Sequence, residues 1–442
     1  MKNLRDEGER IVEKLRAAGH EAYFAGGCVR DMLRGVPAKD YDVATSAHPE
    51  QVMTLFPPEK TSTVGAQFGV VLVHTAAGNV EVATFRADSP ASDGRHPESV
   101  VFCGVREDVL RRDFTINGML YDPVLDKVLD WVGGRADLAG KIVRTIGDPR
   151  QRFEEDKLRL LRAVRFAATL EFSIEENTYQ AMCDMAPKVL EVSIERIRDE
   201  LCAILQSGHG GRGLRLLHDT GLLKAILPEV EAMRGVEQPP QFHPEGDVFE
   251  HTCMMLDAMP DAAPVELAMG VLLHDVGKPQ TQTFDERIRF DEHDRVGVEM
   301  SRHICRRLRF SRDQSAQIIS LVENHMRFGM VTRMKLSTLK RLFGLPRFDE
   351  HLELHRLDCI TSHGKLDHYE FVLNKLSELS EEDIKPPPLL TGNDLIGMGY
   401  PPGPLFRQIL SGLEEEQLEG RIATTAVAKE WVLRRFPKGQ GA

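Results

Sequence analysis

Two aspartates, Asp40 and Asp42, stand one residue apart and could together hold a divalent metal ion. They end the run GGCVRDMLRGVPAKDYDVAT, residues 26–45, whose last part is typical of a β-strand. Side chains two residues apart on a strand point to the same face, so both carboxylates would converge on one point. Such pairs hold Mg²⁺ against a nucleoside triphosphate. The alternative is a turn with two solvated aspartates.

Residues around this pair add to the same chemistry. The upstream glycines Gly26 and Gly27 and the cation Arg30 could form a cradle for phosphates. Glu81, in the expected strand NVEVATF, has apolar neighbours in sequence, where a charge is costly unless it is used or paired. It is the candidate third carboxylate, and a solvent-facing glutamate on an edge strand is the alternative. Two metal ions between three carboxylates would activate a 3′-hydroxyl and stabilise a pyrophosphate leaving group.

A second motif could select a nucleobase. Its four residues are spaced by three along an expected helix face and are Asp156, Arg159, Arg162 and Arg165. An aspartate accepts a hydrogen bond from an exocyclic amine, and an arginine donates to a ring nitrogen. Cytosine and adenine offer both groups, whereas guanine and uracil would leave both protein groups unsatisfied, at a cost of about 1–3 kcal/mol each. A solvated face of ion pairs is the alternative.

The second half of the chain contains an ordered set of histidines and aspartates. Imidazole and carboxylate groups suit a transition metal that activates water. An adjacent His-Asp pair, with a histidine before it and an aspartate after it, rarely arises by chance. The expected ligands are His251, His274, Asp275 and Asp358, with His293 and His325 for a possible second metal or phosphate. A helical scaffold without activity is the alternative.

The elements that must position these residues change character along the chain. Of 442 residues, 42% are hydrophobic, which allows several domains with real cores. Short β-branched runs between residues 21 and 145 predict a small mixed sheet, and helical periodicity dominates from about residue 150. The fold class is therefore α+β. The predicted domains are a head at 1–148, a helical neck at 149–235, a His-rich helical domain at 245–372 and a helical tail at 385–442, with linkers at 234–247 and 384–404.

The composition limits the cellular environments and the partners that we expect for this protein. The net charge of −12 argues against nucleic acid as a partner of the whole surface, but local basic clusters such as 302–309 leave room for it. No apolar run is long enough for a membrane span, and the amphipathic N-terminus is unlike a signal peptide. The seven cysteines form no C-x-x-C pair, which favours reduced thiols and a cytoplasmic protein. No obligate protein partner is evident.

Three motifs carry a family resemblance. GGCVRD…KDYDVAT, RRDFTINGMLYDP at 111–123 and EEDKLRLLRAVRFA at 154–167 resemble the class II tRNA nucleotidyltransferases. These are the bacterial-type CCA-adding enzymes and their poly(A) polymerase relatives, in the DNA polymerase β superfamily. The resemblance implies a β-rich head that holds Mg²⁺ and a neck that reads the base. It implies triphosphate binding by Gly27, Arg30 and Arg112, base reading by Asp156 and Arg159, and contacts to base or phosphates by Arg162 and Arg165.

The implied reaction is addition of CCA to the 3′ end of tRNA from CTP and ATP. The S-D-G-R-x-P core within 85–102 resembles the loop that CCA-adding enzymes need for the final A, although His96 stands where arginine is common. An A-adding enzyme or a poly(A) polymerase is the alternative, but residues 64–73 lack the G-R-R-F-type signature of the latter. An RNA-binding protein with inactive sites is an alternative of another class.

The His-rich block resembles the HD phosphohydrolase superfamily over about 250–370. The resemblance implies hydrolysis of phosphate esters with Mn²⁺, Ni²⁺, Co²⁺ or Fe²⁺. Because the imidazole ligands must be deprotonated, activity should fall below about pH 6, near the ordinary pKa of histidine. For the tail, which has a helix expected to start near Pro404, the resemblance implies a grip on the tRNA backbone. A plain helix cap is the alternative there.

Overall fold

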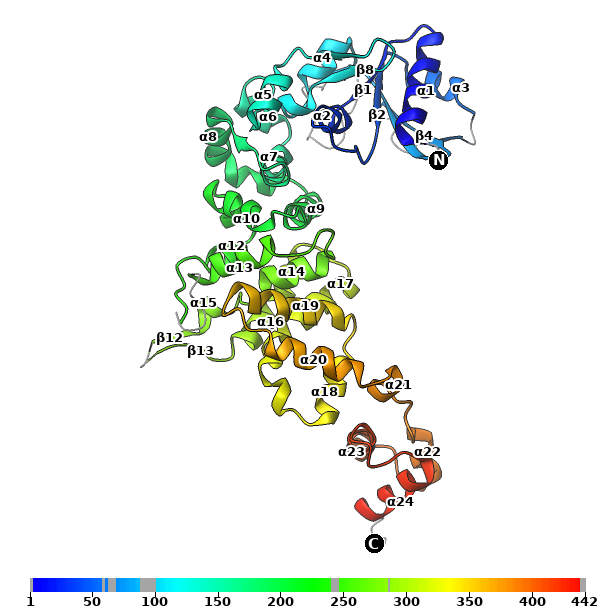
Figure 1. Ribbon diagram of the computed structural model, residues 1–442, viewed down its shortest axis with the longest axis vertical. Helices are drawn as coiled ribbons and strands as arrows, with labels where there is room; N and C mark the ends of the chain where they lie inside the picture. Colours follow the sequence, from blue (N-terminus) through cyan, green and yellow to red (C-terminus); the bar gives the residue numbers. More distant parts are fainter. Residues whose placement is uncertain are drawn as a thin grey trace. The chain divides into compact units, whose positions relative to one another are not determined.

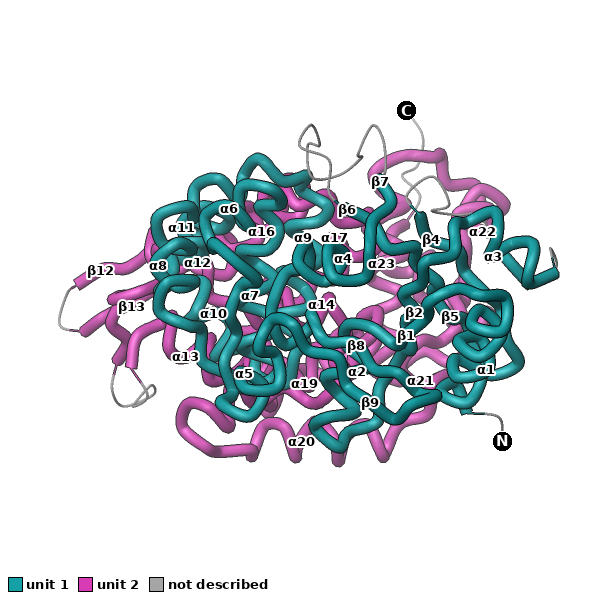
Figure 2. The backbone as a smooth tube through the Cα atoms, turned by 90° about the horizontal axis from the view of Figure 1, so that it is seen from above, with its two compact units in different colours: residues 1–231 teal, residues 232–442 magenta. Residues whose placement is uncertain are grey.

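The computed structural model divides the chain into two compact units, residues 1–231 and 232–442 (Figure 2). It describes residues 3–57, 60–62, 69–87, 101–239, 246–284 and 287–437. Among the helices in these ranges, none combines the length and apolarity of a membrane span. The unit boundary lies four residues before the predicted end of the neck, and the division into four domains stays a prediction.

The first unit contains the predicted mixed sheet. Its seven strands follow the order β3-β4-β5-β2-β1-β8-β9, in which β2 and β5 are parallel and every other pair is antiparallel. The α+β class is therefore confirmed. The strands are β1 (Ala22–Ala25), β2 (Asp42–Thr45), β3 (Thr61–Ser62), β4 (Val70–Thr75), β5 (Gly78–Thr84), β8 (Leu120–Asp122) and β9 (Lys127–Leu129).

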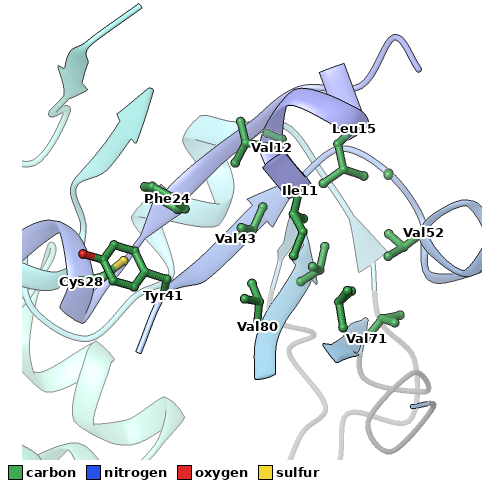
Figure 3. Packing of buried hydrophobic residues seen from close by; sticks show 14 of the residues in the cluster. Ile11, Val12, Leu15, Phe24, Cys28, Tyr41, Val43, Val52, Val71 and Val80 are labelled. Carbon is green, nitrogen blue, oxygen red and sulfur yellow. The ribbon is translucent and has the colours of Figure 1, made fainter. Parts of the chain in front are cut away.

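Helix α1 (Leu4–Ala17) covers one face of this sheet (Figures 1 and 3). Ile11 and Leu15 stand four residues apart on the helix and pack with Phe24 and Val43 of the central strands. All four side chains are buried. Because strand side chains alternate, packing α1 on this face leaves Asp42, the neighbour of Val43, directed to the other face.

Helices complete the first unit. Helix α7, which carries the arginines of the second motif, packs on α9 and α10. At Gly213 of α10 a Cβ atom would lie 2.3 Å from Cγ2 of Ile204, so glycine allows α10 to approach α9 closely. The helices and remaining strands are α2 (Gly27–Leu33), α3 (Pro49–Leu55), β6 (Arg86–Ala87), β7 (Val101–Phe102), α4 (Val105–Leu110), the 3₁₀ helix η3 (Thr115–Asn117), α5 (Gly134–Gly140), β10 (Ile142–Val143), α6 (Pro149–Glu155), α7 (Leu158–Thr169), β11 (Ser173–Ile174), α8 (Glu176–Met185), η4 (Ala186–Glu191), α9 (Ile194–Leu205), α10 (Gly210–Asp219), α11 (Leu222–Ile226) and α12 (Pro228–Glu231).

The described residues of the second unit are helical, apart from one small hairpin. Helix α14 is buried along most of its length and packs against α13, α17 and α19 (Figure 1). Its elements are α13 (Val248–Asp257), α14 (Val265–Leu273), α15 (Lys278–Thr281), β12 (Gln282–Phe284), β13 (Ile288–Phe290), α16 (His293–Arg307), α17 (Arg312–Asn324), η5 (His325–Arg333), α18 (Leu336–Phe343), α19 (Phe348–Thr361), α20 (Asp367–Ser377), α21 (Glu381–Ile384), α22 (Gly392–Gly397), α23 (Pro404–Leu418) and α24 (Thr425–Arg435).

The predicted linker at 384–404 is ordered structure, so that prediction was wrong in part. It contains α22, and its residues Leu390, Leu395 and Tyr400 are buried in a small core with α23 and α24. The hydroxyl of Tyr400 donates a hydrogen bond to the carbonyl of Phe436 at 2.7 Å. Proline and glycine indicated the turns correctly, but the apolar residues between them pack against residues later in the chain.

Candidate active sites

The sheet brings two of the three head carboxylates to one face. Asp42 begins β2, and Glu81 lies on the adjacent strand β5. In the parallel ladder Val43 stands opposite Val82, so Asp42 and Glu81 each precede one member of this pair. Because Val43 and Val82 are buried, the residues before them point to the opposite face.

Asp40 lies two residues before β2 and is exposed, so the predicted placement of both aspartates on one strand was wrong. Asp40 nevertheless stays near Asp42. Burial raises the pKa of Asp42 to about 7, and the negative charges of Asp40 and Glu81 act in the same direction, against the cation of Arg112. Like charges that act on one another in this way are unfavourable alone and would be stabilised by a divalent cation.

The sequence argument for Glu81 was wrong, because its carboxylate is exposed. Its neighbours Val80 and Val82 point to the opposite, buried face, which is ordinary strand alternation. Of the alternative, the solvent-facing part holds, but the edge position does not, because β5 lies between β4 and β2. The position of Glu81 beside Asp42 follows from the parallel register, which no local sequence pattern encodes.

A glycine separates the carboxylates from a predicted phosphate-binding cation. Gly26 has a φ of 76°, a conformation that favours glycine. A Cβ atom there would lie 3.6 Å from Nη1 of Arg112 and 4.0 Å from Oδ2 of Asp42. The other nitrogens of Arg112 donate to Asp108, with Nη2 at 3.0 Å from Oδ2. Arg112 is thus fixed by α4, with one nitrogen directed toward the carboxylate site.

Gly27 begins α2, and Arg30 lies one turn later on the same helix. Hydrogen bonds fix the guanidinium group of Arg30. Its Nε and Nη2 donate to Asp31 at 3.0 and 2.9 Å, and its Nη1 donates to Oδ1 of Asn117 at 2.9 Å. Asp108 and Asn117 were not selected from the sequence. Both belong to the segment around the RRDFTINGMLYDP motif, which was the signal available.

The second motif does not form a single helix face. Asp156 has extended backbone between α6 and α7, and its Oδ1 accepts the N–H of Leu158 at 3.1 Å. Aspartate favours such turns because its side chain satisfies a free N–H near a helix start. The helix therefore begins after Asp156, and the prediction of one continuous face was wrong at this residue. Its Oδ2 accepts a hydrogen bond from Arg196 of α9 at 3.0 Å.

Arg159 is buried and makes hydrogen bonds within the protein. Its Nη1 donates to the carbonyl of Arg152 and to Oε2 of Glu155, both at 3.0 Å, and its Nη2 donates to the carbonyl of Arg111 at 2.9 Å. Arg159 therefore connects the neck helix to the RRDFTINGMLYDP segment. Its role in reading a base stays a prediction.

Arg162 and Arg165 converge on one aromatic ring. Arg162 donates from Nε and Nη2 to Oδ2 of Asp113, at 3.0 and 2.6 Å. The guanidinium groups of Arg162 and Arg165 lie 5.3 and 4.5 Å from the ring centre of Phe166, and that of Arg30 lies 5.5 Å away. Phe166, which the sequence analysis missed, thus brings the predicted triphosphate and base residues together.

The second unit collects all six predicted histidine and aspartate ligands in two groups. One group consists of His251, His274 and Asp358, and the other of Asp275, His293 and His325. Within each group the ligand atoms lie within 4.8 Å of one another. Asp275 faces both groups, with Oδ2 at 3.1 Å from Nε2 of His274 and Oδ1 at 3.5 Å from Nε2 of His293. The two groups therefore form one continuous centre.

The tautomers of these histidines fit metal ligation. The Nδ1 atoms of His274, His293 and His325 lie 2.8, 2.8 and 2.7 Å from the backbone carbonyls of Val271, Phe290 and Val322, so each Nδ1–H donates there. Each Nε2 then carries a lone pair. The Nε2 atoms of His293 and His325 face each other at 3.2 Å. Two acceptors at this distance are stabilised by a metal ion or by a shared proton.

Charge and burial set protonation states that favour cation binding at this centre. Burial lowers the pKa of His325 to about 4, and the nearby His274 adds to the effect, so its imidazole is neutral at pH 7. Burial opposes the ionisation of Asp275, but His274 and Lys278 hold the pKa of Asp275 well below its usual range. The sequence analysis missed Lys278, whose Nζ lies 2.6 Å from Oδ2 of Asp275. Its position one turn after the His-Asp pair was the available signal.

Comparison with known proteins follows this division of the chain. A model described as the poly A polymerase head domain matches residues 22–144. A model described as a probable RNA and SrmB- binding site of polymerase A matches residues 171–234, and the HD domain model matches residues 247–361. The chain therefore contains segments similar to a poly(A) polymerase head, its RNA-binding region and an HD domain.

Two curated CCA-adding enzymes are similar to about half of the chain. The CCA-adding enzyme of Geobacillus stearothermophilus is 43% identical over 229 residues, which are 52% of this chain and 56% of the relative. That of Ligilactobacillus salivarius is 40% identical over 228 residues, 51% of this chain and 56% of the relative. The chain thus matches about half the length of these curated relatives.

Solved structures of CCA-adding enzymes are similar to nearly the whole length of the chain. The CCA-adding enzyme of Bacillus stearothermophilus in complex with CTP has a TM-score of 0.74 and 27% identity, covering 98% of this chain and 99% of the other. The CCA-adding enzyme of Thermotoga maritima complexed with tRNA has a TM-score of 0.58 and 19% identity, covering 97% and 95%, which supports the fold alone. The S-D-G-R-x-P core and residues 64–68 lie outside the described residues.

Proposed function

We propose that this protein adds cytidine, cytidine and adenosine to the 3′ end of tRNA, using CTP and ATP and releasing pyrophosphate. The observation that carries the proposal is the position of Asp42 beside Glu81 on adjacent parallel strands, where burial and then the charges of Asp40 and Glu81 raise the pKa of Asp42. The relatives named CCA-adding enzyme support the choice of substrates.

The three carboxylates would hold Mg²⁺ in the head. When bound, Mg²⁺ supplies positive charge that stabilises the triphosphate and the charge that develops during transfer. Arg112, directed toward Asp42 across Gly26, would bind phosphate oxygens beside the carboxylates. Gly27 and Arg30 would complete the cradle, with Arg30 preorganised by Asp31 and Asn117.

The neck would select the base without a nucleic-acid template. Asp156 would accept a hydrogen bond from the exocyclic amine of cytosine or adenine, and arginine would donate to the neighbouring ring nitrogen. Arg159 is the arginine that the family resemblance assigns to this role, and Arg162 and Arg165, above Phe166, would contact the base or the phosphates.

Addition reactions on three tRNAs test the proposal. The tRNAs lack CCA, CA or the terminal A, and each is incubated with CTP, ATP or both. With both nucleotides we expect completion of CCA on each tRNA, whereas CTP alone should extend only the first two, to CC, and ATP alone should complete only the third. A single adenosine added only to tRNA ending in CC would favour the A-adding alternative, and long adenosine tails would favour a poly(A) polymerase. Binding of tRNA without addition would favour the alternative of an inactive RNA-binding protein.

Replacing Asp156 with alanine should relax base selection. The change removes the acceptor that a uracil or guanine carbonyl would face, so discrimination should fall by an amount that corresponds to about 1–3 kcal/mol. The measurement is kcat/KM for CTP and ATP relative to UTP and GTP. Asp199→Ala, an exposed aspartate of α9, is the matched control. An unchanged ratio in Asp156→Ala would mean that Asp156 serves only its ion pair with Arg196.

We also propose that the HD centre hydrolyses phosphate esters, such as 2′,3′-cyclic phosphate ends or small nucleotides. Two acceptor Nε2 atoms at 3.2 Å, on His293 and His325, are the observation that supports a metal there. A transition metal such as Mn²⁺, Ni²⁺, Co²⁺ or Fe²⁺ would supply an activated water. His251, His274 and Asp358 would hold one ion, His293 and His325 a second ion or a phosphate, and Asp275 would face both.

A glycine next to this centre provides a test that leaves every ligand in place. A Cβ atom at Gly277 would lie 2.1 Å from the carbonyl oxygen of His293. Gly277→Ala should therefore displace the start of α16 and reduce metal content and hydrolysis, while CCA addition persists. Elemental analysis and a phosphodiesterase assay measure the effect. Gly329→Ala, where a Cβ atom meets nothing within 4 Å, is the control. Full metal content in Gly277→Ala would contradict the role assigned to His293.

A further inference from the structure

A buried lysine at the HD centre has partners on several sides. Lys278 is 7% exposed, so its charge is costly unless it is paired. Its Nζ lies 2.6 Å from Oδ2 of Asp275 and donates a hydrogen bond to Oε1 of Gln238, also at 2.6 Å. The ring of Phe290 lies beside it, with its centre 5.3 Å from Nζ. An ammonium group has three N–H donors, and these three contacts can take all of them.

Gln238 reaches this lysine from the stretch before α13, for which the sequence predicted a linker. Backbone carbonyls fix this stretch to the HD domain. The carbonyl of Val236 accepts the N–H of Val248 at 3.1 Å, and the carbonyl of Glu237 accepts a hydrogen bond from Nε2 of Gln282, also at 3.1 Å. The stretch is therefore anchored by contacts that do not involve the side chain of Gln238.

The two ends of the Gln238 amide differ in their partners. Because an ammonium group donates and cannot accept, the end that faces Lys278 must be the carbonyl oxygen. The other end, Nε2, is buried, and among the residues that the structure describes it has no hydrogen-bond partner. A donor buried in this way destabilises the folded chain. Stability is therefore a poor explanation for a glutamine at this position, and its contact with Lys278 is a better one.

This contact affects Asp275, the residue that faces both groups of the centre. The oxygen next to Lys278, Oδ2, also lies 3.1 Å from Nε2 of His274. The other oxygen, Oδ1, lies 3.5 Å from Nε2 of His293 and 3.8 Å from Nε2 of His325. A lysine held at Oδ2 fixes the plane of the carboxylate. Oδ1 is then directed toward the two histidines, where a second ion would bind.

We propose that Gln238 is a positioning residue for the second metal ion of the HD centre, which holds Lys278 at Oδ2 of Asp275 and thereby directs Oδ1 to that ion. The inference rests on the proposed metal-dependent function of this centre. Without the amide oxygen, the flexible side chain of Lys278 loses one of its two oxygen acceptors and can move away from Asp275. The carboxylate can then turn. The group with His293 should lose affinity for its ion, whereas the group with His251 keeps its own ligands.

The test measures binding of Mn²⁺ to the full chain by electron paramagnetic resonance, in Gln238→Met and Gln238→Glu. Methionine keeps much of the side-chain length without an acceptor, whereas glutamate keeps an acceptor for Lys278. We expect two Mn²⁺ ions in the wild type. In Gln238→Met the affinity for one of them should fall by about tenfold to a hundredfold. Gln238→Glu should bind both ions at least as tightly as the wild type. Gln280→Met, an exposed glutamine of α15, is the matched control.

A double-mutant cycle separates positioning through Lys278 from a general structural effect. If Gln238 acts through Lys278, Gln238→Met should not lower the affinity further in a Lys278→Met background. If Lys278→Met does not fold, the comparison of the two Gln238 variants still decides.

Three results would overturn the inference. They are wild-type Mn²⁺ binding in Gln238→Met, equal losses in Gln238→Met and Gln238→Glu, and a single Mn²⁺ ion in the wild type. A wild-type chain that binds no Mn²⁺ would instead refute the proposed metal-dependent function itself, which is a distinct result.

Discussion

Replacing Asp42 with asparagine should abolish nucleotide addition and, at the same time, stabilise the metal-free protein. Asparagine has nearly the same shape, so the sheet and its register are kept. The change removes one ligand of the proposed Mg²⁺ site and one of three negative charges that repel one another. Loss of activity combined with a gain in stability distinguishes a metal site from a structural carboxylate.

The pH dependence has a definite sign. Burial and the charges of Asp40 and Glu81 raise the pKa of Asp42 to about 7 in the folded state, above its ordinary value of 3.8. Between these two values the folded protein binds more protons than the unfolded chain, so stability falls as the pH rises. The loss is complete above pH 7 and amounts to at most about 4 kcal/mol.

Thermal unfolding in EDTA from pH 4 to pH 8 measures this effect. Asp42→Asn should unfold at a higher temperature than the wild type at pH 8 and at the same temperature near pH 4. Mg²⁺ with CTP should stabilise the wild type and not the variant. Asp6→Asn, an exposed aspartate of α1, is the control. Equal unfolding temperatures at every pH, or normal addition by Asp42→Asn, would sink the metal assignment.

The spacing of residues in the sequence was enough to identify the head site but not to predict how its residues come together. Asp40 and Asp42 were recognised from a three-residue pattern, although only Asp42 lies on the strand. Glu81 was selected for a wrong reason, its apolar neighbours, and reaches Asp42 through the parallel pairing of β2 with β5. Strand register between segments about 40 residues apart depends on the whole sheet, so a local pattern cannot supply it.

The residues that support the site were harder to foresee. Arg196 lies outside the three family motifs, and its contact with Asp156 arises from how α9 packs on α7. Phe166 lies within the motif at 154–167, but its contact with Arg30 arises from tertiary packing. Gly277 and Lys278, in contrast, lie two and three residues after Asp275, and helical spacing could have indicated them. Sequence motifs therefore identified the residues proposed to contact substrate or metal, whereas most of the supporting residues could be identified only from tertiary packing.

The structure also changes the pH dependence that we expect for activity at the HD centre. An ordinary histidine pKa predicts loss of activity below about pH 6. Because burial lowers the pKa of His325 to about 4, this residue should keep its metal to lower pH. In the metal-free protein the unfolded chain binds more protons than the folded one between about pH 6.5 and 4. The contribution of His325 to stability is therefore lost as the pH falls through this window.

Replacing His274 with alanine should remove bound metal and hydrolysis together without slowing AMP addition. His274 contacts Asp275 and belongs to the group with His251 and Asp358, so its loss removes a ligand at the middle of the centre. Protein reloaded with Mn²⁺, Ni²⁺ or Co²⁺ is assayed on 2′,3′-cyclic nucleotides and p-nitrophenyl phosphate, with metal measured by elemental analysis. His303→Ala, an exposed histidine of α16, should behave as the wild type. A wild-type protein that holds no metal and hydrolyses neither compound would show that the HD domain is a scaffold, because the facing Nε2 atoms of His293 and His325 would then share only a proton.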